Sequence, residues 1–216
     1  GLNFIVSPDV LVPRSPLAEL IPEQFLPWLD ASQNARILDL CTGGACIAIA
    51  MAVNMPACLI DAVDISAAAL NIAAQNVALH SVGGRVTLIE SDLFLELGDV
   101  KYDLIVSNPP YVSTDVFERL PAEYRAEPSI GLACGEDGLD IVLQILDASP
   151  CYMNQQAILI VEVGESAEAL LDLLPQVPFL WLEFQYGGDG IFLLEYDQLM
   201  ACQPDVRAVL EQRKNV

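Results

Sequence analysis

The chain has 216 residues, 54% of them hydrophobic, and its 30 acidic and 9 basic side chains give a formal net charge of −21. This length and hydrophobicity are enough to form a full core, which excludes a disordered chain. The charge repels a phosphate backbone, which excludes nonspecific nucleic-acid binding, and it either attracts a basic protein or serves only solubility.

The first 30 residues are a predicted lead-in to a larger domain. An apolar stretch at residues 4–6 predicts a short strand, and a proline-rich loop that carries Arg14 follows it. From Leu17 to Leu29 apolar residues recur at helical spacing, which predicts one or two helices, although two prolines must interrupt them. Arg14 is a candidate substrate residue, and an ordinary loop arginine is the alternative.

Residues 31–216 predict one α/β domain, because apolar strands and helices alternate along the chain. Ser66 is the expected N-cap of the second of these helices. The expected strands cover residues 36–40, 58–64, 86–89, 102–107 and 157–163, and the expected helices cover residues 46–53, 67–79, 139–146 and 167–174.

Two stretches depart from this alternation. Near the C-terminus, Phe179–Phe184 and Ile191–Tyr196 flank a glycine-rich turn and predict a terminal antiparallel hairpin, after which Pro204 predicts the start of a polar helix. The stretch Ser113–Asp137 is longer than a usual connection, which predicts a functional loop over the site. Glu127 within this loop is a candidate substrate residue.

Neither a membrane nor a metal is an expected partner. No apolar run reaches the roughly 18 residues needed to span a bilayer, and no signal segment opens the chain, so a cytoplasmic location is predicted. The six cysteines lack paired ligand spacing and His80 is the single histidine, so no metal site is predicted.

Four polar side chains fall at the expected carboxyl ends of four successive strands, where an open α/β sheet binds its ligand. They are Asp39, Asp64, Asp92 and Asn108. After Asp39, the small residues of Gly43–Ala45 let the backbone approach a ligand, and the next helix points its free N–H groups at the site. Asp64 is placed to accept hydrogen bonds from ribose hydroxyls. Asp92 is placed to accept one from an adenine amino group.

The tetrapeptide Asn108–Tyr111 follows the fourth strand. Pro109 and Pro110 fix two φ angles and remove two backbone donors, so the loop offers carbonyl oxygens and the Asn108 amide as its polar groups. A planar nitrogen with two N–H donors fits such a loop, and Tyr111 can stack on it. The guest is then a side-chain amide or an exocyclic amine, and a plain turn is the alternative.

A nicotinamide dehydrogenase is a second interpretation of the same strand ends. Gly43, Ala45 and Ala48 form a degraded version of the dinucleotide-binding glycine spacing, which is weak on its own. Against it, Asp39 places a carboxylate at the end of the first strand. The ammonium and sulfonium of S-adenosylmethionine suit that carboxylate better than a pyrophosphate does.

Three segments resemble the class I S-adenosylmethionine-dependent methyltransferases that modify protein glutamine side chains: Asp39–Ala50, Ala62–Ser66 and Ser107–Val112. Nearly the whole chain is similar to this family. A second set of features resembles the branch that acts on a large-subunit ribosomal protein, rather than the release-factor branch: Val12–Pro16, Cys41, Trp181–Phe184, Gly187 and Gly188.

The resemblance implies a Rossmann-like class I methyltransferase fold with a mostly parallel seven-stranded sheet, and a helical substrate-recognition domain upstream of residue 1. It implies methyl transfer from S-adenosylmethionine to a glutamine amide of a basic ribosomal protein, without direct nucleic-acid binding. The implied catalytic residues are Asn108, Pro109, Pro110 and Tyr111. The implied cofactor-binding residues are Asp39, Cys41, Thr42, Gly43, Gly44, Ala45, Asp64, Ile65, Asp92, Leu93 and Asn108.

One departure from the family affects the expected cofactor site. The family shows Gly-Ser-Gly where this chain has Gly43-Gly44-Ala45, so a methyl group is expected to meet the cofactor and weaken its binding. Three alternatives stay open: a release-factor glutamine methyltransferase, an adenine-N6 nucleic-acid methyltransferase, and a catalytically silent cofactor-binding module.

Overall fold

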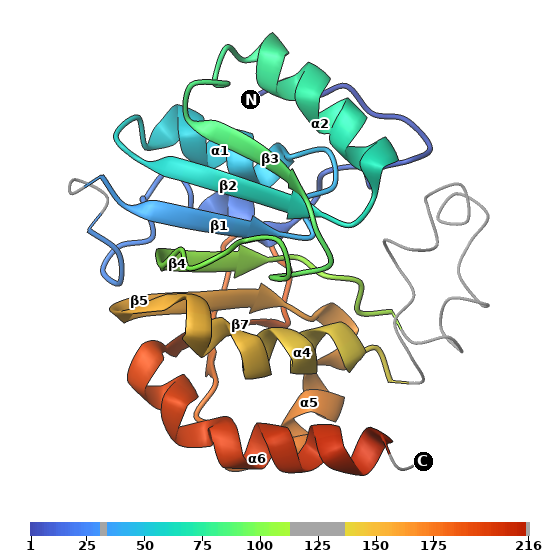
Figure 1. The fold of residues 1–216 in the computed structure, drawn as a ribbon, viewed down its shortest axis with the longest axis vertical. Helices are drawn as coiled ribbons and strands as arrows, with labels where there is room; N and C mark the ends of the chain where they lie inside the picture. Colours follow the sequence, from blue (N-terminus) through green and yellow to red (C-terminus); the bar gives the residue numbers. More distant parts are fainter. Residues whose placement is uncertain (31–33, 113–136, 215–216) are drawn as a thin grey trace.

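The computed structural model describes residues 1–30, 34–112 and 137–214 (Figure 1). A seven-stranded sheet with strand order β3-β2-β1-β4-β5-β7-β6 runs through the molecule. β7 pairs antiparallel with β5 and β6, and the remaining pairings are parallel, which confirms the predicted sheet and its terminal hairpin. The strands are β1 (Arg36–Leu40), β2 (Leu59–Asp64), β3 (Val86–Glu90), β4 (Tyr102–Ser107), β5 (Met153–Glu162), β6 (Leu180–Trp181) and β7 (Ile191–Glu195).

Helices follow the strands as their apolar periodicity predicts. Ser66 Oγ accepts a hydrogen bond from the backbone N of Ala69 at 3.2 Å, which confirms the N-cap of the second α-helix. The α-helices of the described residues are α1 (Cys46–Asn54), α2 (Ala67–Leu79), α4 (Asp140–Ala148), α5 (Ala167–Leu173) and α6 (Tyr196–Lys214), and the 3₁₀ helices are η1 (Pro16–Glu19), η5 (Ser149–Tyr152) and η6 (Gly164–Ser166).

The sheet separates two hydrophobic cores. On one face, strand residues such as Ile37, Leu104 and Ile160 pack with apolar side chains of η1, α1 and α2. On the other face, alternate residues of the same strands pack with α4, α5 and α6. In Figure 1, α4, α5 and α6 lie together in the lower part of the molecule and α1 and α2 lie in the upper part. Helices on both faces explain why the central strands are apolar throughout, as expected of a parallel sheet.

The predicted strand at residues 4–6 is wrong. The backbone N–H of Ile5 donates to Oδ1 of Asn76 at 2.7 Å, and its carbonyl accepts from Nδ2 of Asn76 at 3.1 Å. A side-chain amide on α2 thus satisfies the backbone groups that a neighbouring strand would otherwise pair.

The predicted helix over residues 17–29 is replaced by η1 and a series of turns. Pro22 and Pro27 lack the N–H that a continuing helix needs. Between these prolines, Gln24 and Phe25 take positive φ values of 56° and 58°, which a right-handed helix does not contain. The apolar residues still reach the core as expected: Leu17, Ile21, Phe25 and Leu29 are all buried.

The predicted start of the last helix at Pro204 is also wrong, because α6 begins at Tyr196 and contains Pro204. Proline leaves the carbonyl four residues earlier, that of Met200, without its helical donor. The helix nevertheless continues to Lys214. No helix in the described part of the chain is long and apolar enough to cross a membrane.

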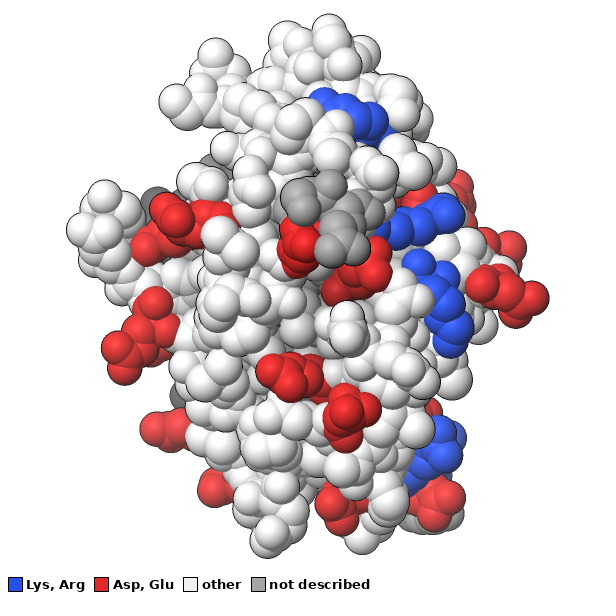
Figure 2. All heavy atoms as spheres, turned by 90° about the vertical axis from the view of Figure 1, so that its left-hand side faces the viewer, with Lys and Arg blue, Asp and Glu red and all other residues white. Residues whose placement is uncertain are grey.

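Acidic side chains are more widely spread than basic ones over the surface at the amino ends of the parallel strands (Figure 2). Figure 2 shows this face, where Asp and Glu are spread widely and Lys and Arg gather along one side. The parallel strands point away from this face in Figure 1. Their carboxyl ends therefore lie on a different side of the molecule.

Candidate functional site

The strand register brings four residues to one level at the carboxyl edge of the sheet. Leu40 pairs with Val63 and with Ser107, and Ser107 pairs with Val161, so these four form one row across β2, β1, β4 and β5. The next residue on each strand lines a cavity of about 360 Å³, a size typical of small-molecule sites. These lining residues are Cys41, Asp64, Asn108 and Glu162.

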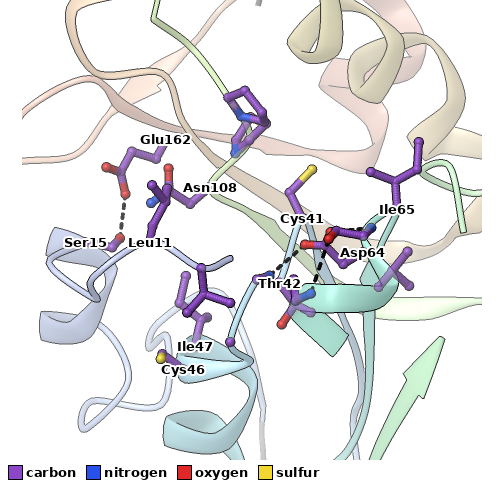
Figure 3. Close-up of a pocket in the computed structure, with 18 of the residues that line it drawn as sticks. Leu11, Ser15, Cys41, Thr42, Cys46, Ile47, Asp64, Ile65, Asn108 and Glu162 are labelled. Carbon is purple, nitrogen blue, oxygen red and sulfur yellow. Dashed lines mark hydrogen bonds between the residues drawn. The ribbon is translucent and has the colours of Figure 1, made fainter. Parts of the chain in front are cut away.

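The cavity lies at the topological switch point, where the strand order reverses between β1 and β4. β1 is followed by α1 on one face, whereas the chain after β4 leads to α4 on the other face. Loops that leave neighbouring strands toward opposite faces open a crevice between them, and open α/β sheets bind their ligands there. Figure 3 shows this arrangement, with Asn108 and Glu162 on one side and Asp64 and Ile65 on the other.

Asp64 fixes the loop after β1. Its Oδ2 accepts from the backbone N of Gly43 at 2.8 Å, and its Oδ1 accepts from the backbone N of Ser66 at 2.9 Å. Burial raises the pKa of Asp64, while these backbone hydrogen bonds oppose the rise. Each carboxylate oxygen keeps a second lone pair, so Asp64 can still accept hydrogen bonds from a ligand in the cavity.

Asp39 lies one step behind this row and does not line the cavity. It is fully buried, and its Oδ2 accepts from Thr42 Oγ1 at 2.5 Å and from the backbone N of Ala48 at 3.1 Å. Its Oδ1 is buried and has no hydrogen-bond partner in the part of the chain that the structure describes. Burial raises the pKa of Asp39 to about 7. Asp39 therefore contributes to the site through Thr42, which does line the cavity.

The expected contact of the Ala45 methyl group with the cofactor stays a prediction, because Ala45 is not among the residues that line the cavity. Ala45 has a φ of 59° and is fully buried among core side chains, outside the cavity lining. Gly43 and Gly44 line the cavity instead. Gly43 has a φ of 54° with open space where a Cβ would stand, so at this point the backbone itself faces the cavity.

Asn108, Pro109, Pro110 and Tyr111 all line the cavity. The side-chain amide of Asn108 makes no hydrogen bond within the described residues, and the residue is partly exposed. No described residue therefore competes with a guest for its polar atoms. Pro109, the next residue, has a backbone carbonyl and no N–H, so it offers a second hydrogen-bond acceptor beside the Asn108 side chain.

Sequence reasoning missed Glu162, which lies at the end of β5 beside Asn108. It is 6% exposed and lines the cavity. Its Oε1 accepts from Tyr111 Oη at 3.2 Å and its Oε2 from Ser15 Oγ at 2.5 Å. The sequence did contain a signal for Glu162, because it is an acid at the end of an apolar strand, and the same pattern led to the prediction of Asp64.

Residues 9–15 form one side of the cavity, here called the N-terminal wall. Arg14 belongs to this wall, so the structure brings that candidate substrate residue to the site. Ile65, Asp92 and Leu93 also line the cavity. Glu127, the other candidate substrate residue, lies outside the described residues.

The cavity lining is predominantly acidic. Among the described lining residues, four carboxylates, from Asp9, Asp64, Asp92 and Glu162, stand against one guanidinium, that of Arg14. The unpartnered Oδ1 of Asp39 lies behind them. Such a lining favours a cationic ligand over an anionic one, because each carboxylate is stabilised by an opposite charge nearby.

The strand order, the helices on both faces and the position of this cavity define a Rossmann-like class I methyltransferase fold. Two solved structures support that assignment at the level of the fold. The hMettl16 catalytic domain has a TM-score of 0.70 at 17% identity, covering 90% of this chain and 75% of that chain. A methyltransferase from Pyrococcus furiosus has a TM-score of 0.65 at 16% identity, covering 90% of this chain and 89% of that one.

Sequence comparison leads to the particular family. The family model described as Methyltransferase small domain matches residues 22–122. A ribosomal protein uL3 glutamine methyltransferase of Xanthomonas campestris is 51% identical over 93% of this chain and 65% of its own length. One of the same name from Xylella fastidiosa is 46% identical over 99% of this chain and 68% of its length. The chain belongs to the family of ribosomal protein uL3 glutamine methyltransferases.

Proposed function

We propose that this chain transfers a methyl group from S-adenosylmethionine to the side-chain amide nitrogen of a glutamine in ribosomal protein uL3. The observation that carries the proposal is Asn108, which lies in an acidic cavity at the carboxyl end of β4, is followed by two prolines, and makes no side-chain hydrogen bond to any described residue. Family membership supports the substrate. The chain spans 65% of the length of the Xanthomonas relative, and the proposal extends the activity of such a whole enzyme to this chain.

The residues of the cavity fit S-adenosylmethionine, which when bound supplies an electrophilic methyl group on a sulfonium. Asp64 is held by two backbone N–H groups and would accept from the ribose hydroxyls. Gly43 and Gly44 would allow the methionine part to lie against backbone. Behind this loop, Asp39 Oδ1 has no hydrogen-bond partner within the described residues, and this carboxyl becomes negatively charged as pH rises through its pKa of about 7, which suits an ammonium or sulfonium.

Asn108 and Pro109 would prepare the glutamine for transfer. An amide nitrogen is a poor nucleophile because its lone pair is delocalised into the carbonyl. If Asn108 Oδ1 and the Pro109 carbonyl each accept one amide hydrogen, the nitrogen is oriented and the positive charge that develops on it meets two fixed dipoles. Such preorganised contacts are typically worth about 3 kcal/mol each. Tyr111 would pack on the amide plane. The new N–CH3 bond would replace the S–CH3 bond of the donor, which would leave as the neutral thioether S-adenosylhomocysteine, and the methylated nitrogen would then lose one of its two hydrogens to water as a proton.

The partner that this mechanism implies is a basic ribosomal protein of the large subunit. The net charge of −21 favours a basic protein and disfavours direct contact with nucleic acid. A substrate of this kind would place the reaction in the cytoplasm, where such a protein is assembled into ribosomes.

Incubation of the chain with radiolabelled S-adenosylmethionine tests the proposal. Recombinant uL3, a release factor and an RNA serve as separate acceptors, and tandem mass spectrometry locates the label. We expect label on one glutamine of uL3, and replacement of that glutamine by asparagine should remove it. Label on the release factor or on RNA instead, or on none of the three, would overturn the assigned substrate.

A further inference from the structure

Tyr111 is held from several sides by residues distant in sequence. Gly164 has a φ of 47°, and a Cβ placed on it would stand 2.5 Å from Cε2 of the Tyr111 ring, so the ring lies directly against this glycine. Ser166 Oγ is 2.8 Å from the Tyr111 carbonyl oxygen. Glu162 accepts from the Tyr111 hydroxyl. These three supports all follow the apolar part of β5.

Glu162 connects this aromatic ring to the N-terminal wall. Its second oxygen accepts from Ser15 Oγ, and the same hydroxyl oxygen accepts from the backbone N of Leu17 at 3.2 Å as the N-cap of η1. Ser15 therefore uses both its donor and an acceptor site. The connection joins three segments that are far apart in sequence: residues 15–17, Tyr111 and the end of β5.

A carboxylate is a costly residue for a purely structural bridge. Burial disfavours its charged form, and the pKa of Glu162 is raised mainly for this reason. A neutral amide of the same size costs less to bury, but it offers one acceptor oxygen where the carboxylate offers two. What the carboxylate adds is charge-assisted hydrogen bonds, which are about twice as strong as neutral ones and fix geometry more tightly. Tight geometry matters at a residue that lines the cavity beside Asn108.

We propose that Glu162 is a positioning residue that holds Tyr111 against the substrate amide and couples its orientation to the N-terminal wall through Ser15. This inference rests on the proposed methyl transfer, because Tyr111 is the group that would touch the glutamine. Misplacing a reacting group by about an ångström can cost about 100-fold in rate. Glu162 would therefore act on turnover rather than on cofactor binding.

The test compares Glu162→Gln with Glu165→Gln. Glutamine keeps the size of Glu162, but its one carbonyl oxygen can accept from only one of the two hydroxyls on geometry set for both. Glu165 also lies near Tyr111 and contributes negative charge there, yet it is exposed and no hydrogen bond joins it to the ring. The pair separates loss of the hydrogen bond from loss of nearby charge.

For Glu162→Gln we expect kcat for uL3 to fall about 10- to 100-fold, with affinity for S-adenosylhomocysteine by calorimetry unchanged. Glu165→Gln should keep the wild-type kcat. On a Tyr111→Phe background, which lacks the hydroxyl, Glu162→Gln should cost less than about twofold, because the two changes remove the same interaction. Equal kcat losses with and without the Tyr111 hydroxyl would overturn the proposal.

A spectroscopic experiment tests the positioning role of Glu162 independently of whether the chain methylates uL3. Fluorine NMR of protein labelled with 3-fluorotyrosine reports the environment of Tyr111, and Tyr111→Phe assigns its signal. We expect that signal to shift and broaden in Glu162→Gln and in Ser15→Ala, and to stay in place in Glu165→Gln. If wild type fails to methylate uL3, the proposed function fails while this signal still tests the positioning. An unmoved signal in Glu162→Gln would refute the positioning role.

Discussion

Asn108 and Asp64 stand on either side of the end of β1, and their surroundings differ. Both oxygens of Asp64 already accept backbone hydrogen bonds, whereas the Asn108 amide has none within the described residues. A pre-engaged carboxylate suits a binding role in a fixed loop. An unengaged amide suits a group that forms its contacts when the reacting substrate arrives.

Replacing Asn108 by Ala should therefore remove turnover and spare cofactor binding. We expect kcat for uL3 to fall about 100- to 1,000-fold, the usual effect of deleting one preorganised polar contact. Affinity for S-adenosylhomocysteine, measured by calorimetry, should stay close to wild type. Retained turnover in Asn108→Ala would remove the basis of the proposed mechanism.

Replacing Asp64 by Ala should have the opposite emphasis. The change deletes the expected ribose contacts and releases the backbone N of Gly43, so we expect the Kd for S-adenosylhomocysteine to rise about 10- to 100-fold. Glu90 pairs with Asp64 across the sheet but is exposed and outside the cavity lining, so Glu90→Ala is the matched control. Equal affinities for the two variants would argue against the ribose role.

Asp39 gives a pH prediction. Its pKa is about 7 in the folded protein against an ordinary value of 3.8, so between these pH values the folded protein binds more protons than the unfolded chain. The free energy of unfolding should fall as pH rises through this window, by at most about 1.4 kcal/mol per pH unit from this group. Chemical denaturation at several pH values measures this. In Asp39→Asn the contribution should vanish, and parallel curves for the two proteins would contradict the burial effect.

At the scale of elements, the β5–α5 connection supports Tyr111 through Gly164. Gly164→Ala forces a methyl group into the ring and places alanine at a positive φ. We expect a stability loss above the roughly 1–2 kcal/mol typical of alanine at such a φ, together with at least about a tenfold loss of kcat.

Gly98→Ala is the matched control for Gly164→Ala. Gly98 has a φ of 60° and open space where the Cβ would stand, so this change isolates the backbone cost. Thermal or urea unfolding gives the stability of each variant, and methylation of uL3 gives kcat. The same kcat in both variants would mean that Gly164 does not position the ring.

The sequence predicted most elements because each one is locally consistent. α2 and β4 have the predicted bounds, since Ser66 caps the start of α2 and the apolar run of β4 ends at Asn108-Pro109. Residues 17–29 were mispredicted because their apolar spacing is helical while Pro22 and Pro27, within the segment, allow only η1 and turns. Residues 4–6 were mispredicted because their backbone groups pair with Asn76, a distant side chain that local sequence does not reveal. Glu162 was missed for a related reason: its importance comes from Ser15 and Tyr111, which sequence spacing does not bring together.

At the scale of the whole molecule, net charge bears on how a basic substrate arrives. A charge of −21 attracts a cation over roughly one Debye length, about 10 Å at 0.1 M ionic strength. We expect the KM for uL3 to rise several-fold as NaCl is raised from about 0.05 to about 0.3 M, while affinity for S-adenosylhomocysteine changes less. A KM that is flat across this range would contradict electrostatic attraction of the substrate.

The two hydrogen bonds between Asn76 and Ile5 have a practical consequence for protein engineering. The same buried amide also donates to the Gly44 carbonyl at 3.0 Å, so the first residues of the chain, α2 and the loop after β1 share one anchor. The N-terminal wall of the cavity, residues 9–15, follows this anchor in the chain and ends at Ser15. A chimera that exchanges catalytic domains between relatives should therefore place its crossover before residue 4. A junction near residue 30 would take the N-terminal wall of the cavity from one parent and the rest of the cavity from the other.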